Sequence, residues 1–208
     1  MSGNTNMLSN PLAVLKPAKE QRLYSLSEYL QREERSKERH EYYNGTIIKL
    51  PMARIPHNLI VPNISAELIF AFRLKNKPFK VLGSQQLIYL PELNFSLYPD
   101  VLVVAEMPQS WNNNEVLLIN PLLIIEVLSR STKKYDRTEK FEAYKTLESF
   151  REYVLIDPDK CHIETRYREE PHLWRDTTCK NLEDKIELRS VDCAIELSSI
   201  YSGVTFKK

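Results

Sequence analysis

The chain has 208 residues, of which 42% are hydrophobic and 10% aromatic, enough for one sizeable core. Its 29 basic and 28 acidic residues leave a formal net charge of +1, so any contact with nucleic acid must come from a local patch. No apolar run approaches the roughly 20 residues that a bilayer span needs, which predicts a soluble protein with no membrane partner. We expect a flexible N-terminal arm over residues 1–20, which is polar and has no hydrophobic period, and a single domain over residues 21–208.

Several classes of site are disfavoured by the rarer residue types. The three cysteines form neither a C-x-x-C pair nor an even disulfide framework, and the N-terminal stretch lacks the pattern of a secretory signal, so we expect a cytoplasmic protein. The four histidines are not spaced like ligands of a transition metal. With four glycines in the chain and no G-x-S-x-G motif, a nucleotide-cradling loop and a hydrolase elbow are both improbable.

The first third of the chain predicts a helix, a hairpin and a second helix. Ser25 and Glu28 have the S-x-x-E spacing of a capping box, so a helix is expected from there to about Lys37. The Asn44-Gly45 pair predicts a hairpin turn between two short strands. Apolar residues at helical spacing predict a helix from Asn58 to about Lys75, in which Pro62 either causes a kink or lies in the first turn.

The rest of the chain predicts mostly strands. Three strand candidates come first: "FKVLGSQQLIYL", bent at its glycine, then "YPDVLVVAE" and "PLLIIEVLS". A helix over residues 133–147 follows, and then a strand pair, "REYVLIDP" with "CHIETRYR". The C-terminal "IELRSVDCAIELSSIYSGV" suggests a strand, a short strand and a closing helical turn. This order predicts an α+β or α/β domain with a mixed sheet.

A carboxylate, Glu126, lies inside one of the most apolar strands. Side chains alternate between the two faces of a strand, and both faces of this one are mostly apolar, which is typical of a strand covered on both sides. An unpaired carboxylate there costs several kcal/mol or takes up a proton. Glu126 therefore needs a partner, which could be a cation, a metal ion or a hydrogen-bond donor.

Two further residues could complete a site with Glu126. Asp100 begins another apolar strand, and if the two strands are neighbours the carboxylates lie across a strand spacing of roughly 4.8 Å, close enough to share one Mg²⁺. Lys140 lies four residues after Asp136 on the following helix and can point back toward the sheet. In a phosphodiester-cleaving site, such a lysine would steer the attacking water or offset charge on the phosphate.

Each of these residues also has a plain structural interpretation. Asp100 could be a turn residue after proline, and Asp136 and Lys140 could be an ordinary ion pair on a charged helix face. His57 could approach a phosphate or hydrogen-bond locally at a helix start, and Asp136 and Ser129 could cap the helix. A pair of acids would also fit a glycosidase, but the sequence lacks an aromatic-rich sugar cleft and that interpretation ignores the lysine.

Taken together, "YPDVLVV", "PLLIIEVLS", "STKKYDRTEKFEAYK" and "EYVLIDP" resemble the restriction endonuclease family called Uma-two, of the PD-(D/E)xK nuclease superfamily. The similarity runs from about Leu26 to Val204. It implies a restriction-endonuclease-like core, a mixed β-sheet flanked by helices. It also implies a Mg²⁺-dependent nuclease, with Mn²⁺ as a substitute, that hydrolyses phosphodiester bonds in DNA, and a homodimer, because cutting both strands of a duplex usually needs two sites.

The resemblance also implies the site residues. The superfamily pattern has a lysine two residues after the acid, where this chain has Leu128, and Lys140 on the next helix would replace it. The implied metal ligands are Asp100, Glu126, the backbone carbonyl of Val127 and, as a supporting ligand, Glu41. Glu41 could instead orient a water, or simply be a salt-bridged strand acid. No separate DNA-reading module is visible, so no recognition sequence is predicted.

Two other functions remain open at this point. The chain could be a nuclease-fold protein with weak or no catalysis that acts as a nucleic-acid-binding or assembly module, which its near-neutral charge and displaced lysine would allow. It could also be an unrelated binding domain in which Glu126 is a structural, salt-bridged acid.

Overall fold

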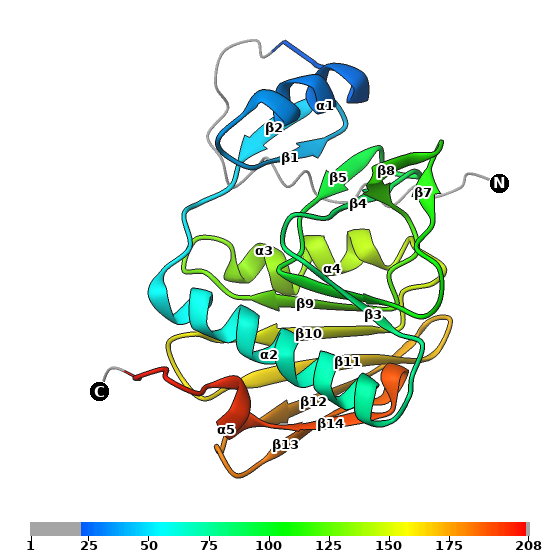
Figure 1. Cartoon of the computed structure of the whole chain (residues 1–208). Helices are drawn as coiled ribbons and strands as arrows, with labels where there is room; N and C mark the ends of the chain where they lie inside the picture. The colour runs from blue at the N-terminus through cyan, green and yellow to red at the C-terminus, as the bar shows by residue number, and fades with distance from the viewer. Residues whose placement is uncertain (1–21, 207–208) are drawn as a thin grey trace, which may run out of the picture.

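The structure is a computed structural model that describes residues 22–206 (Figure 1). The predicted N-terminal arm lies outside the described residues. The elements are α1 (Leu26–Arg35), β1 (His40–Tyr43), β2 (Thr46–Lys49), α2 (Ile55–Leu74), β3 (Lys80–Gly83), β4 (Leu87–Leu90), β5 (Phe95–Leu97), β6 (Val101–Val104), β7 (Ser110–Trp111), β8 (Asn114–Leu118), β9 (Leu123–Val127), α3 (Lys133–Arg137), α4 (Glu139–Tyr144), β10 (Glu152–Ile156), β11 (Ile163–Glu170), β12 (Leu173–Cys179), β13 (Lys185–Leu188), the 3₁₀ helix η2 (Arg189–Val191), β14 (Cys193–Glu196) and α5 (Leu197–Ile200). No helix within residues 22–206 has the length and apolar character to cross a membrane.

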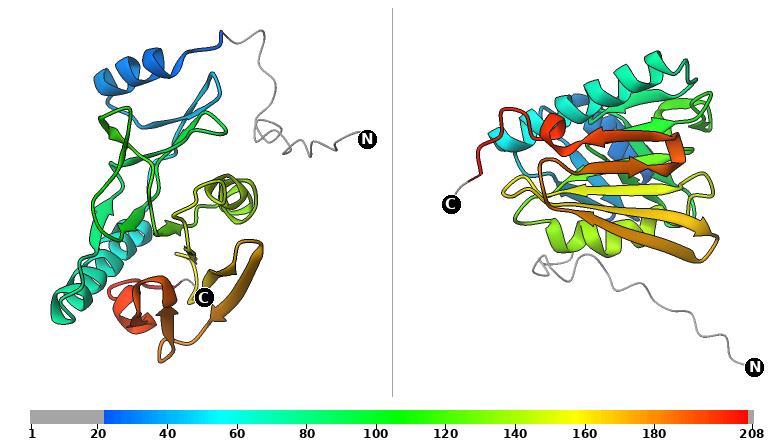
Figure 2. Two further views of the ribbon diagram at one scale, coloured as in Figure 1. Left: turned by 90° about the vertical axis from the view of Figure 1, so that its right-hand side faces the viewer. Right: turned by 90° about the horizontal axis from the view of Figure 1, so that it is seen from below.

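A six-stranded mixed sheet forms the centre of the fold, in the order β12-β11-β10-β9-β6-β3. Its β9 and β10 are parallel, and its other neighbouring strands are antiparallel. Helix α2 covers one face, and α3 and α4 lie on the other (Figure 2). The alternating side chains of β9 are buried on both faces, with Ile125 packed toward α2 and Ile124 toward α4. The predicted mixed sheet flanked by helices is confirmed.

A second mixed sheet, in the order β2-β1-β5-β4-β8-β7, packs against α1. The stretch "FKVLGSQQLIYL", predicted as one bent strand, forms two strands in different sheets: β3 belongs to the central sheet and β4 to the second sheet. The single-strand prediction is therefore wrong. A turn closed by the bond from Gln86 N to Gly83 O, 3.1 Å long, separates the two strands. The sequence prediction missed the short strands β5, β7 and β8.

The N-terminal predictions are confirmed by their local chemistry. The Ser25 hydroxyl accepts from Glu28 N at 3.2 Å and the Glu28 carboxylate accepts from Ser25 N at 2.8 Å, so both halves of the capping box form. The hairpin between β1 and β2 turns at Asn44 and Gly45, both at positive φ. Helix α2 begins earlier than predicted, and Pro62 lies in its interior and not in its first turn.

The helix predicted over residues 133–147 is wrong as a single element. It breaks at Thr138 into α3 and α4, where the backbone has φ −121° and ψ −89°. The Thr138 hydroxyl donates to Lys134 O at 2.8 Å, a side-chain bond to the preceding turn that competes with helix continuation. Within residues 22–206, Asp136 and Lys140 form no ion pair with each other, so the plain helix-face interpretation does not hold.

The C-terminal part follows the prediction with one addition. Strands β10 and β11 pair antiparallel, and β13, β14 and α5 form the predicted strand, short strand and helical turn. The addition is β12, which pairs with β11 at the edge of the central sheet. Its side chains are mostly exposed, so its sequence lacks the apolar alternation that reveals a strand.

Candidate active site

The two predicted acids lie where β6 begins and β9 ends. Strands β6 and β9 are antiparallel neighbours with Val101 opposite Ile125, and continuing this register places Asp100 opposite Glu126. Residues opposite each other in an antiparallel pair are separated by about 4.5–5.5 Å between Cα or Cβ atoms. The two strands are therefore neighbours, as the shared-metal hypothesis requires.

Lys140 reaches Glu126 from α4. Its ammonium nitrogen lies 2.9 Å from Glu126 Oε1 and 3.2 Å from Glu41 Oε1, and it donates to Tyr98 O at 3.2 Å. All three charged side chains are buried. The structure thus brings together three residues that were predicted as site residues: Glu126 on a strand, Lys140 on the next helical segment and Glu41 on the first hairpin.

Tyrosines complete this network, and the sequence prediction did not assign them. Tyr144 OH donates to Glu126 Oε1 at 3.1 Å, and Tyr43 OH donates to Glu41 Oε2. Tyr98 N donates to Glu41 Oε1 at 3.1 Å. A signal for Tyr144 was present in the sequence, because it follows Lys140 by one helical turn and therefore shares its face. Tyr43 carries no comparable signal, because its contact depends on how the hairpin meets the central sheet.

Asp100 is held by protein groups on both oxygens. His57 Nε2 lies 3.0 Å from Asp100 Oδ1, and Val127 N donates to Asp100 Oδ2 at 2.8 Å. His57 brings its imidazole ring close to the carboxylate, within ion-pair distance. Its other ring nitrogen, Nδ1, is buried and has no hydrogen-bond partner within residues 22–206. His57, at the start of α2, is thus part of the site through Asp100.

A fourth carboxylate, Asp136, lies beside the network. Its Oδ2 accepts from the Thr132 hydroxyl at 2.6 Å, and Ser129 Oγ lies 2.8 Å from Thr132 Oγ1. Ser129 and Thr132 therefore link the end of β9 to the start of α3. The predicted capping role of Asp136 and Ser129 is wrong, because the N-cap of α3 is Thr132, which makes no side-chain capping bond, and Asp136 lies inside the helix. Burial raises the pKa of Asp136 to about 6.

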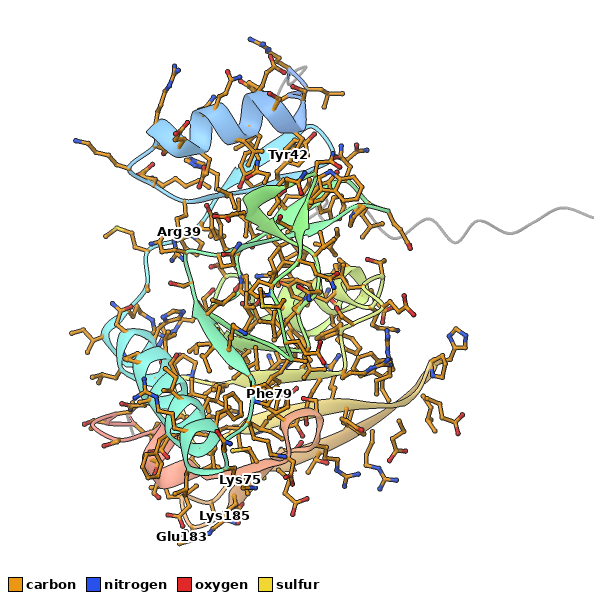
Figure 3. All side chains as sticks on the ribbon, turned by 45° about the vertical axis from the view of Figure 1, so that its right-hand side comes forward. Arg39, Tyr42, Lys75, Phe79, Glu183 and Lys185 are labelled. Atoms are coloured by element: carbon orange, nitrogen blue, oxygen red, sulfur yellow. The ribbon has the colours of Figure 1, made fainter. Side chains whose placement is uncertain are left out.

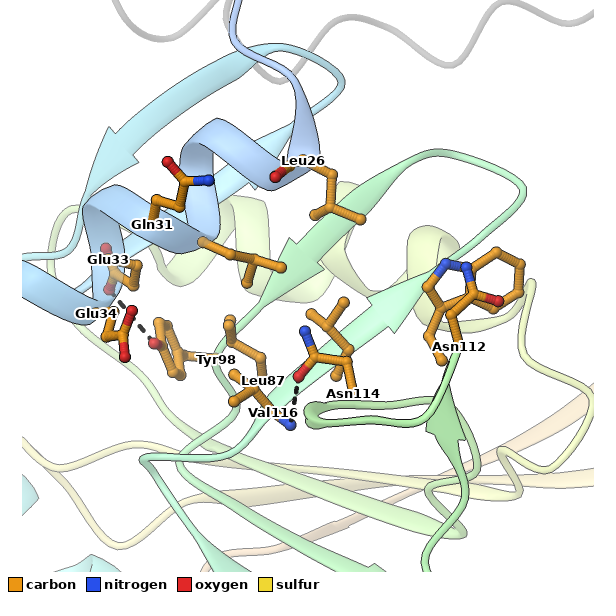
Figure 4. A pocket seen from close by; sticks show the side chains of 13 residues that line it. Leu26, Gln31, Glu33, Glu34, Leu87, Tyr98, Asn112, Asn114 and Val116 are labelled. Atoms are coloured by element: carbon orange, nitrogen blue, oxygen red, sulfur yellow. Dashed lines mark hydrogen bonds between the residues drawn. The ribbon is translucent and has the colours of Figure 1, made fainter.

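These groups line one cavity of about 90 Å³ at the ends of the strands. Four carboxylates and two permanent cations, Lys140 and Arg39, border it, so its formal charge is −2 with His57 neutral. Arg39 lies between the second sheet and the start of α2 (Figure 3). A larger groove of about 670 Å³ lies between α1 and strands β4 and β8, on another side of Tyr98 (Figure 4). Among residues 22–206, only Glu33 and Glu34 add charge to its lining.

Burial and the neighbouring charges together set the protonation of the site. Burial raises the pKa of Glu126 well above its usual range, the Lys140 ammonium opposes this rise, and the neighbouring Asp100 and Asp136 add to it. Burial opposes the charge of Lys140, but the surrounding carboxylates outweigh it and hold the pKa of this lysine well above its usual value. Lys140 therefore remains protonated, and the cavity favours an additional positive charge.

The donor set suits a hard divalent cation. No three His, Cys, Asp or Glu side chains between residues 22 and 206 are already grouped as metal ligands. Mg²⁺ needs only one or two carboxylates, because it keeps several waters and takes other ligands from substrate phosphates. Asp100 and Glu126 at one edge, with the negative charge of the cavity, meet that requirement.

The fold and these residues place the chain in a defined class. The model of the Uma2 family, described as "Putative restriction endonuclease", matches residues 26–198, and the chain belongs to this family. The predicted family resemblance is confirmed.

The chain is also similar to individual proteins. Two are from Synechocystis. The "Uncharacterized protein sll1609" is 35% identical over 136 residues, which cover 65% of this chain and 76% of the relative. The "Uncharacterized protein slr1290" is 29% identical over 182 residues, which cover 88% of this chain and 93% of the relative. A crystal structure described as a "putative nuclease belonging to DUF820", from Anabaena variabilis, superposes with a TM-score of 0.70 at 18% identity, covering 88% of this chain and 99% of that one. This last match supports the fold alone.

Proposed function

We propose that this protein is a Mg²⁺-dependent endonuclease that hydrolyses phosphodiester bonds in DNA. The observation that carries the proposal is the ammonium of Lys140, 2.9 Å from Glu126 Oε1, although the two residues come from different elements. With Asp100 opposite Glu126 in the register, the edge of the sheet presents two acids and a lysine, the residue types that the superfamily motif requires.

Each residue has a role in this proposal. Asp100 and Glu126 would hold the cation, with the Val127 carbonyl as a further oxygen ligand, and His57 orients the Asp100 carboxylate through their 3.0 Å contact. Lys140, which remains protonated, acts as a hydrogen-bond donor and a positive charge toward the attacking water or the phosphate, and not as a general base. A bound Mg²⁺ would lower the pKa of a coordinated water and polarise the phosphate.

Glu41 is better suited to positioning Lys140 than to binding the cation. Its two oxygens accept from Tyr43 OH and Tyr98 N, and Lys140 lies 3.2 Å away. The cavity of about 90 Å³ holds a few waters or an ion but not a nucleotide, so the scissile phosphate would approach at its mouth. This arrangement favours cleavage within an exposed backbone.

The test is nicking of supercoiled plasmid DNA with Mg²⁺, Mn²⁺ or EDTA. Wild type should nick only with a divalent cation, and Asp100→Asn and Glu126→Gln should each lower the rate by at least about a hundredfold, the loss typical of removing one electrostatic catalytic group. The matched control is Glu152→Gln, because Glu152 is also a buried strand carboxylate but accepts its hydrogen bonds from Arg189 N and from Ser190. Cleavage that survives both site substitutions would place the chemistry elsewhere.

A second function, a nuclease-fold module without robust catalysis, is favoured by one observation. The three N–H donors of the Lys140 ammonium have three partners, Glu126, Glu41 and Tyr98 O, which is the arrangement expected of a purely structural ion-pair network. Calorimetric titration separates the two: the nuclease should bind Mg²⁺ or Mn²⁺ at millimolar concentration and lose that binding in Glu126→Gln. The homodimer stays a prediction, which light scattering on the purified protein would test.

A further inference from the structure

A cluster of exposed charges lies beside the cavity, at the carboxyl ends of the parallel strands β9 and β10. Arg54, the residue before α2, has its Nη2 2.9 Å from Asp159 Oδ1 and 3.0 Å from Asp159 Oδ2. Arg130, in the segment after β9, has its Nε 3.5 Å from Asp159 Oδ2. Two guanidinium groups from distant parts of the chain thus converge on one carboxylate.

This cluster contributes little to the stability of the fold. The side chains of Arg54, Arg130 and Asp159 are 45%, 75% and 41% exposed, and exposed ion pairs contribute little to the free energy of unfolding. Each guanidinium carries five N–H donors, and within residues 22–206 each uses one nitrogen here. Two cations share one acid, so the cluster keeps a net positive charge and spare donors.

The cluster adjoins the proposed active site. Ala53 and Ser129, the neighbours of the two arginines in the chain, line the cavity that holds Asp100 and Glu126. Figure 1 shows the start of α2, the end of β9 and the turn after β10 at the same edge of the sheet. Ligands of sheets with parallel strands commonly bind outside the carboxyl ends of those strands.

The charge of this edge differs from that of the cavity and of the whole chain. The contacts of Asp159 with Arg54 and Arg130 bring the segments 50–54, 128–134 and 157–160 together. In sequence these segments contain more cations than acids: the cations are Arg54, Arg130, Lys133, Lys134 and Lys160, and the acids are Asp157 and Asp159. The cavity itself is acidic and the chain is close to neutral. An acidic metal site beside a basic rim suits a polyanion that presents one phosphate to the metal and its neighbours to the rim.

We infer that Arg54 and Arg130 form a subsite for a backbone phosphate of the polynucleotide, next to the phosphate that is cleaved. The inference rests on the proposed nuclease function. Asp159 contacts one nitrogen of each guanidinium group, and a phosphate, which has more acceptor oxygens than a carboxylate, would take over these contacts and pair with the spare donors. The subsite reads no base, in keeping with the sequence analysis, which predicts no recognition sequence.

The test is the salt dependence of DNA binding, measured by fluorescence anisotropy with a labelled 20-base-pair duplex in EDTA, where no metal-dependent cleavage occurs. Each lost phosphate contact should make the slope of log K against log salt shallower by about 0.9. Because both arginines serve one phosphate, Arg54→Gln with Arg130→Gln should make the slope shallower by about 0.9, and Arg130→Gln alone by a smaller amount. Over a fourfold rise in salt, wild type would then lose about 3.5-fold more affinity than the double variant.

The control is Arg175→Gln. Arg175 is also an exposed arginine paired with one carboxylate, Glu169, but the sheet register places it level with Leu123, at the opposite end of β9. Its slope should match that of wild type. An unchanged slope in the double variant, an equal change in Arg175→Gln, or no binding by wild type would each overturn the subsite.

The outcomes also separate the subsite from the nuclease function. A slope change in the double variant without any plasmid nicking by wild type would support the subsite and reject the nuclease. Nicking that depends on Glu126, with no slope change, would retain the nuclease and reject the subsite.

Discussion

Asp136 should make the stability of the protein depend on pH in an unusual direction. Burial raises its pKa from 3.8 to about 6, so the folded protein binds this proton more tightly than the unfolded chain does. Most carboxylates stabilise a fold as they ionise, but here the ionised form is the unfavourable one. Stability from this group is fully present below the unfolded pKa and is lost as the pH rises through the folded pKa.

The magnitude follows from the size of the shift. About two pKa units correspond to about 3 kcal/mol of unfolding free energy, of which about 2 kcal/mol should be lost between pH 4.5 and pH 8. Asp136→Asn removes the titration and keeps an oxygen that can accept from Thr132. Relative to wild type, the variant should therefore gain about 2 kcal/mol of stability over that pH interval.

The assay is urea unfolding of both proteins at pH 4.5 and pH 8, in EDTA so that no cation replaces the proton. Titrating groups distant from Asp136 are common to the two proteins and cancel in the difference. Loss of the Asp136 charge also removes one cause of the raised pKa of Glu126, which changes the difference in the same direction. If the difference in unfolding free energy between variant and wild type is the same at both pH values, Asp136 does not titrate as its burial requires and the reasoning is wrong.

Three further results are expected. Tyr144→Phe removes a donor to the buried Glu126 and should cost about 1–2 kcal/mol in urea unfolding, and no loss would show that this hydrogen bond is not needed. Gly45→Ala should cost about 1 kcal/mol or more because φ is +101°, whereas Gly83→Ala, which meets no atom within 4 Å, should be neutral; equal effects would contradict the turn geometry. At pH 8, Mg²⁺ at ten times its Kd should stabilise wild type by about 1.4 kcal/mol in thermal unfolding, and an equal gain in Glu126→Gln would exclude this site.

The part of the site that could be predicted from the sequence depends on local periodicity. The alternation in β9 places Glu126 in an apolar strand, which by itself requires a partner. The order of apolar stretches makes β6 and β9 reasonable neighbours, and Asp100 at the start of β6 follows. Lys140 could be chosen because it is a cation on the next helical segment with a face toward the sheet.

Other features could not be predicted because they depend on long-range packing. The break at Thr138 depends on a hydroxyl that bonds the preceding turn, in a stretch whose composition suits one continuous helix. The separation of β3 from β4 depends on which sheet each strand joins, and both strands look alike in sequence. Short strands such as β5 and β7 have too few residues to show a period of two.

The His57 contact shows a similar limit. A histidine at a helix start has many local partners, and only the tertiary structure shows that Asp100 is the one it meets. The same holds for Arg54 and Arg130, which are 76 residues apart in the sequence numbering and meet at one carboxylate.

The position of Lys140 bears on how the protein is made and handled. Many small metal-binding domains remain unfolded until their ion binds, because the free energy of metal binding supplies their folding free energy. Here the ammonium group lies between Glu126 and Glu41 and supplies a countercharge from within the chain. We expect the protein to fold during synthesis whatever the supply of divalent ions, and to survive purification in a chelator. The concentration of the ion would then control the activity of the protein and not its folding.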